Sequence, residues 1–227
     1  MFIGHFAPAF AASAITSEAP KLGTLFIAAQ LVDWAFMAFF MVGIEQARIE
    51  PGITVMNGLD LYHMPYTHSL LGTAVFAVAF AAVVGITLRN AVAATWTAIV
   101  VMSHWVLDLL VHRPDLTLAG GEEKMGWGLW NYPWIEIPLE LGITLGAFIW
   151  FMRATKGPIV PPLILMAFLL VFQAISWFGP QPTEYSIALP LTALFAFGLL
   201  TALAYWVGTT RWHRNEVGLG VASPPLW

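Results

Sequence analysis

The sequence contains no cysteine, so it can form neither a disulfide nor a thiolate that acts as a nucleophile or metal ligand. Charged residues are also scarce. They make up 10% of the 227 residues, whereas about 25% is typical of soluble domains. The net charge is −4, and the chain has no basic run. Because phosphate binding needs clustered Lys and Arg, we expect no nucleic-acid partner.

Long apolar stretches make up most of the chain, which is 59% hydrophobic and has a mean hydropathy of +0.77. A membrane-spanning helix needs about 20 mostly apolar residues. Six stretches are of about this length: 22–44, 69–88, 91–112, 135–152, 159–178 and 187–208. The sequence therefore predicts an all-α, polytopic membrane helical bundle of about six spans that contacts membrane lipid.

The two ends of the chain differ from these spans. Residues 2–16 are apolar but short and lack the basic start of a signal peptide, so we expect a half-helix or re-entrant segment there. Residues 213–227 are polar and Pro-rich, which predicts a loose tail after one membrane domain over residues 1–212.

Basic residues indicate an orientation, because cytoplasmic loops are enriched in Lys and Arg. With six spans, one side of the membrane receives Lys21, Arg89, Arg153, Lys156, Arg211 and Arg214, and the other receives Arg48, Arg113 and Lys124. The excess on the first side predicts that both termini are cytoplasmic, and we expect the protein in a bacterial inner (plasma) membrane.

Several ionisable residues lie within the apolar stretches, where a charge is costly unless it is paired, hydrated or bound to a metal. His104 and Asp108 are four residues apart and would share one face of a helix. His112 continues this face by one further turn. The pair fits either a metal site or a buried hydrogen bond that joins two helices.

Three further segments contribute candidate ligands. His63 and His68 flank Pro65, which prevents a regular helix there, so the two histidines can converge from a loop and a helix start. Asp33 lies in the middle of a span, where either the helix breaks or the carboxylate faces a partner. His5 follows Gly4 near the start of the sequence. Taken singly, each of these residues also fits a structural or interfacial role.

As a set, the histidines and aspartates predict a divalent metal site. The candidate ligands come from four separate segments: His5, Asp33, His63, His68, His104 and Asp108. Mixed His and carboxylate ligands suit Zn²⁺, with Mn²⁺ or Fe²⁺ as alternatives. Six ligands exceed one tetrahedral site, so either two neighbouring ions or one ion with outer carboxylates would fit.

The same motifs, in the same order, resemble the YdjM-like family of membrane-bound metal-dependent hydrolases. They are Gly4-His5, Leu31-Val32-Asp33, the run from His63 to Ser69, and Ser103-His104 to Asp108, and they cover about the first 115 residues. The resemblance implies that the six candidate ligands form one polar site with hydrolase activity. It also implies a helix break near Asp33, with residues 2–16 and 22–32 as a hairpin that dips into the membrane.

This chain departs from the family pattern at two places. No second acidic residue and no proline accompany Asp33, so a single metal in place of two would fit this chain. Met64 stands where the family usually has Arg, which removes a phosphate clamp. Both departures weaken the case for cleavage of a phosphoester.

Acidic residues outside these motifs have two interpretations. Glu136 and Glu140 share a helix face, and each could serve as a general base, as an extra ligand or in a structural contact. Asp33, Asp108 and Glu140 are the candidates to accept a proton from a metal-bound water. For Arg113 and Asp115 we favour a surface salt bridge.

Three functions remain open. The first is a hydrolase that acts on a lipid or lipid-linked (phospho)ester with a metal-activated water. The second is a small transporter, because proton and ion pathways also use intramembrane His and Asp. The third is a non-enzymatic membrane subunit with a structural cluster, bound to a partner protein or to further copies of itself.

Overall fold

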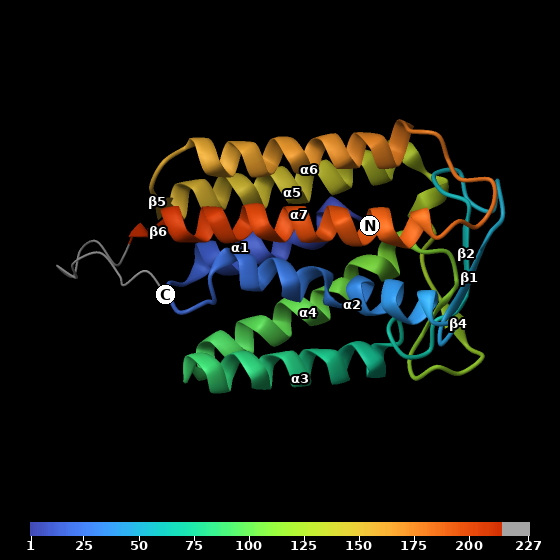
Figure 1. Cartoon of the computed structure of the whole chain (residues 1–227), viewed down its shortest axis with the longest axis horizontal. Helices are drawn as coiled ribbons and strands as arrows, with labels where there is room; N and C mark the ends of the chain where they lie inside the picture. The colour runs from blue at the N-terminus through green and yellow to red at the C-terminus, as the bar shows by residue number, and fades with distance from the viewer. Residues whose placement is uncertain (215–227) are drawn as a thin grey trace.

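The computed structural model describes residues 1–214 as a bundle of helices arranged lengthwise, with short hairpins at its two ends (Figure 1). The elements, in chain order, are η1 Ile3–Phe6, α1 Ala7–Ile15, α2 Leu22–Met41, β1 Gln46–Ile49, β2 Leu59–His63, α3 Leu70–Leu88, α4 Ala91–Val111, β3 Leu116–Thr117, β4 Lys124–Met125, η2 Leu129–Asn131, α5 Pro133–Ala154, β5 Thr155–Lys156, α6 Val160–Phe178, α7 Ala188–Thr210 and β6 Trp212–His213.

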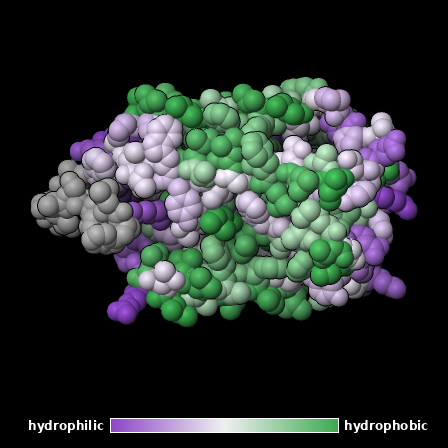
Figure 2. Space-filling view, viewed as in Figure 1, coloured by the Kyte–Doolittle hydropathy of each residue, from purple (hydrophilic) through white to green (hydrophobic). Residues whose placement is uncertain are grey.

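Six of these helices, α2 to α7, are long and apolar enough to cross a membrane. They match the six predicted stretches to within a few residues, so the all-α membrane bundle is confirmed. Hydrophobic side chains cover the middle of the visible surface, and hydrophilic ones gather mainly toward its two ends (Figure 2). This distribution is expected where lipid surrounds the middle of the molecule and water its ends.

The predicted N-terminal half-helix is η1 followed by α1. It lies inside the bundle, in contact with α2 and α5 (Figure 1). Ile3, Phe6 and Phe10 are completely buried and form the centre of the hydrophobic core. The segment is therefore an interior helix of the bundle, and it places the start of the chain deep within it.

The expected helix break near Asp33 is not observed, because α2 continues from Leu22 to Met41. Asp33 instead faces partners within the bundle. Gln30, one turn earlier, donates a 2.8 Å hydrogen bond to its Oδ2 atom, and two histidines lie beside its Oδ1 atom. With its carboxylate accommodated in this way, the helix has no need to break.

One end of the bundle is covered by the hairpins β1–β2 and β3–β4 and by η2, and we call it the hairpin end (Figure 1). Both hairpins are antiparallel. A second, smaller core fastens them to the bundle through Phe36, Leu61, Met64 and Leu116. The hairpin end therefore forms a packed lid over the termini of α2, α3 and α4.

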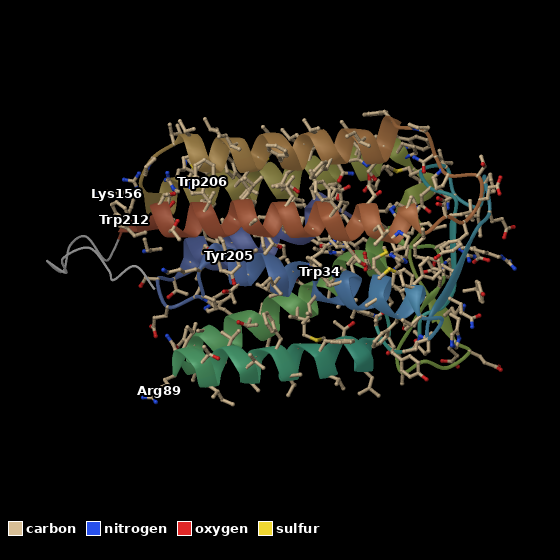
Figure 3. The ribbon with its side chains drawn as sticks, viewed as in Figure 1. Trp34, Arg89, Lys156, Tyr205, Trp206 and Trp212 are labelled. Atoms are coloured by element: carbon tan, nitrogen blue, oxygen red, sulfur yellow. The ribbon has the colours of Figure 1, made fainter. Side chains whose placement is uncertain are left out.

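The opposite end carries β5–β6 and the predicted basic side. Arg89, Lys156 and Trp212 lie there in Figure 3. The helix order places the predicted basic groups Lys21, Arg153 and Arg211 at the same end, away from Arg48, Arg113 and Lys124. His213 pairs with Thr155 across β5–β6, so the predicted tail begins with an ordered contact. The rest of that predicted tail, 215–227, lies outside the described residues.

Candidate metal centre

Helix α4 supplies one side of the site. Asn90 caps the helix by accepting hydrogen bonds from Val92 N and Ala93 N, and α4 then runs unbroken to Val111. His104 and Asp108 therefore share one face. His104 Nε2 lies 3.1 Å from Asp108 Oδ2, as the spacing of four residues predicts. All the polar atoms of this pair are buried deep in the bundle.

His68 enters the site from the turn before α3. Ser69 Oγ accepts a hydrogen bond from Gly72 N and donates one to Pro65 O, which closes the turn and caps the helix. A Cβ atom at Gly72 would lie 1.9 Å from Tyr66 O, so only glycine permits this close approach. The turn directs His68 Nε2 to 3.3 Å from Asp33 Oδ1 and 3.7 Å from Asp108 Oδ2.

Glu45 holds the same turn from the β1 side. Its Oε1 atom accepts hydrogen bonds from Tyr66 N and Thr67 N at 2.8 and 2.9 Å, and its Oε2 atom accepts one from Thr67 Oγ1 at 2.5 Å. Glu45 is completely buried. A buried carboxylate with three donors fixes the backbone on which His68 stands. Sequence reasoning missed this residue, because Glu45 looked like one of several polar groups in a connection.

His5 reaches the site from η1. Its Nε2 atom lies 3.0 Å from Asp108 Oδ1, and its ring stacks on that of His104 with centroids 3.8 Å apart and planes at 7°. Glu140 of α5 holds η1 by accepting hydrogen bonds from Phe2 N and Gly4 N. The amine of Met1 also lies 3.2 Å from Asp108 Oδ1.

His112, which follows the last residue of α4, completes the cluster. Its Nε2 atom lies 3.5 Å from Asp108 Oδ1, and its Nδ1 atom lies 2.8 Å from Asp115 Oδ1. The spacing of four from Asp108 pointed to His112, although it was not among our predicted ligands.

Hydrogen bonds orient three of the four clustered histidines in the same way. His104 Nδ1 lies 2.9 Å from Ala29 O, which can only accept, so this nitrogen carries the proton. His112 Nδ1 faces the Asp115 carboxylate, and His68 Nδ1 lies 2.8 Å from Thr67 Oγ1, whose own proton goes to Glu45. In the neutral tautomers, each Nε2 lone pair then points toward the aspartates. Metal-binding histidines are typically held in this way.

Several of the converging atoms lack a hydrogen bond. Among the buried side-chain atoms of residues 1–214, those without an acceptable partner include His5 Nε2, His104 Nε2 and Asp108 Oδ2. Lone pairs of neutral imidazoles facing carboxylate oxygens repel one another unless a proton or a cation lies between them. The donor set is nitrogen and oxygen, which suits zinc and similar divalent metals.

Three overlapping groups in the cluster could hold a metal ion. They are His5, His104 and Asp108; Asp33, His68 and His104; and His68, Asp108 and His112. Within each group the ligand atoms lie within 4.8 Å of one another. The first and third groups share only Asp108, a carboxylate with two oxygen atoms that can contact two ions. Five of the six predicted ligands are thus brought together.

The remaining predicted residues lie elsewhere. His63 is exposed on β2, opposite Gln46, and belongs to none of the three groups. Glu140, a predicted proton acceptor, contacts η1 and Gln173, which donates to its Oε2 atom at 3.1 Å. These hydrogen bonds hold η1 and Gln173 at one wall of the site, and a role for Glu140 as proton acceptor stays a prediction.

The expected surface pair of Arg113 and Asp115 is wrong. Asp115 is buried, and its carboxylate contacts His112 in addition to Arg113. Arg113 also bonds Asp60 on β2, and thereby joins the site to the hairpin end. The side chain of Asp115 turns inward because His112, three residues earlier, offers it a buried partner.

Comparison of the chain with protein-family models, with curated proteins and with solved structures finds no match. The structure by itself shows a membrane-helical protein with buried His and Asp groups that could bind a metal ion.

Proposed function

We propose that this chain is a membrane-embedded, metal-dependent hydrolase that acts on a lipid or lipid-linked (phospho)ester, and that it belongs with the YdjM-like proteins whose motifs it resembles. The orientation of the histidines is the observation that carries the proposal. Three of them use Nδ1 for acceptors in the surrounding protein and turn Nε2 toward Asp33 and Asp108. A divalent ion, most simply Zn²⁺, would satisfy these converging atoms and supply an activated water.

The position of the cluster supports a lipid-derived substrate. Its ligands lie on membrane-spanning helices or directly beside them, close to the hairpin end. An ester bond near the headgroup of a lipid sits at about this level of a bilayer, whereas its acyl chains lie along the helices. Asp33 is the least buried ligand, with 19% of its side chain exposed, and it is the carboxylate best placed to exchange a proton with a water.

Metal content is the measurement that tests the proposal first. We expect detergent-purified protein to contain one or two equivalents of zinc, manganese or iron, measured by plasma mass spectrometry. A His68→Ala, His104→Ala double variant should contain none. His63→Ala is the matched control, because this exposed histidine lies five residues from His68 but outside the cluster, and it should keep the full metal content.

The number of ions can be determined with single variants. Because the groups that contain His5 and His112 share only Asp108, His5→Gln and His112→Gln should each remove one ion from a two-metal site. Asp108→Asn should remove both. If the folded wild-type protein contains no stoichiometric metal, the hydrolase hypothesis is excluded, and a structural subunit or a transporter is favoured.

Activity is the second test. A screen of phosphoester and carboxylic ester lipids should find turnover that requires the metal and is lost in the double variant, while His63→Ala remains active. Turnover that persists in the metal-free double variant would assign the hydrolysis to a contaminant or to another site.

A further inference from the structure

A cavity of about 320 Å³ adjoins the metal centre at the hairpin end. Its walls come from the two residues before η1, the β1–β2 hairpin, η2, α5, α6, the loop between α6 and α7, and the start of α7. Two of its lining residues touch the His/Asp cluster: the Met1 amine contacts Asp108, and the ring of Trp130 lies 4.2 Å from that of His112. A molecule in this cavity would therefore lie next to the metal centre.

Two carboxylates line the cavity, and their hydrogen bonding differs sharply. Glu140 accepts three hydrogen bonds, from Phe2 N, Gly4 N and Gln173 Nε2. Glu136, one helical turn earlier, is 1% exposed and interacts with Glu140, but its Oε2 atom has no hydrogen-bond partner within the described chain. A buried carboxylate oxygen without a donor is costly, so a ligand that supplies one would be bound favourably.

The rest of the lining favours a cationic donor. Among the described residues that line the cavity there is no Lys, Arg or His side chain, and the Met1 amine is already paired with Asp108. Trp130 and Trp177 add aromatic rings, which attract ammonium groups through their faces. Trp177 Nε1 is a buried donor that also lacks a partner in residues 1–214, and it could bind an oxygen of the same ligand.

We propose that this cavity binds the primary ammonium of a phospholipid headgroup on Glu136 and so presents the lipid ester to the metal centre. The assignment of a substrate class rests on the proposed hydrolase function, whereas the binding of the ammonium group is independent of it. A headgroup of the phosphoethanolamine kind has three N–H donors for Glu136 and phosphate oxygens that can reach Trp177. The same chemistry could come from a soluble amine, and the experiment separates the two sources.

The test measures binding to full-length, metal-depleted protein in detergent, by calorimetry. The probes are short-chain diacyl phosphoethanolamine, diacyl phosphoglycerol of equal chain length, and water-soluble phosphoethanolamine. We expect the wild type to prefer the ethanolamine lipid to the glycerol lipid by about tenfold or more, the usual effect of a buried charge-assisted hydrogen bond. Glu136→Gln should abolish this preference and leave the metal content unchanged.

Glu123→Gln, which alters an exposed carboxylate in the hairpin β3–β4, is the control and should keep the preference. Equal affinity of the wild type for the two lipids would overturn the proposal, and this outcome needs no variant. A preference for the ethanolamine lipid that survives Glu136→Gln would also overturn it. If soluble phosphoethanolamine binds as tightly as the lipid, the conclusion that the ligand is a lipid is overturned. Because no metal or turnover is involved, a failed hydrolase assay leaves these outcomes unaffected.

Discussion

Glu140 is the residue for which the structure makes the most specific prediction. Its carboxylate accepts hydrogen bonds from Phe2 N at 2.6 Å, Gly4 N at 2.9 Å and Gln173 Nε2 at 3.1 Å, and it is buried. Glu140→Ala leaves two buried donors and one partly buried donor without an acceptor. Each costs about 1–3 kcal/mol, and rearrangement recovers part of this, so we expect a loss of about 3–5 kcal/mol in the free energy of unfolding.

The same substitution should also affect the metal centre. Since Glu140 holds η1, its loss releases His5 from its position 3.0 Å from Asp108. We therefore expect a lower metal content in addition to the lower stability. Glu140→Gln keeps the size of the side chain and one acceptor oxygen, and it should cost only about 1–2 kcal/mol.

Denaturant unfolding in detergent, followed by metal analysis, measures both effects. Glu136→Gln is the matched control one turn away on the same helix. Because Glu136 Oε2 accepts no hydrogen bond, the control should change stability by less than about 1 kcal/mol. The reasoning is refuted if Glu140→Ala unfolds at the wild-type midpoint. If Glu140→Gln loses activity with stability and metal content intact, Glu140 acts in the reaction and is not an anchor.

Three further predictions follow from the surroundings of the cluster. Thr67→Val removes the hydroxyl between Glu45 and His68, and it should weaken metal affinity about 10–100-fold in a competition assay; unchanged affinity would mean that His68 is held by the turn alone. Asn90→Ala removes the cap of α4 and should lower the free energy of unfolding by about 1 kcal/mol, with the metal content unaffected. A loss of metal would contradict this and would mean that the start of α4 supports the site. Removal of the metal with a chelator should lower the thermal unfolding midpoint, and zinc should restore it, because an ion that binds only the folded state stabilises that state; identical midpoints with and without chelator would exclude a structural contribution of the ion.

The local features of this protein could be predicted from its sequence. Span length and hydropathy depend on neighbouring residues, so all six membrane helices were predicted to within a few residues. The approach of His104 to Asp108 follows from a spacing of four on one helix. The concentration of His and Asp in an apolar chain indicated chemistry that could bind a metal, because such groups need a reason to be buried.

Long-range contacts decided the rest. His63 and His68 look equivalent in the sequence, but Glu45 and the cap of α3 turn only His68 inward. The role of Glu140 depends on η1, which lies more than 130 residues away in the chain. Asp33 remains within an unbroken helix because residues from other elements face it. Which polar groups find partners in a bundle depends on how the helices pack together, and no local pattern contains that information.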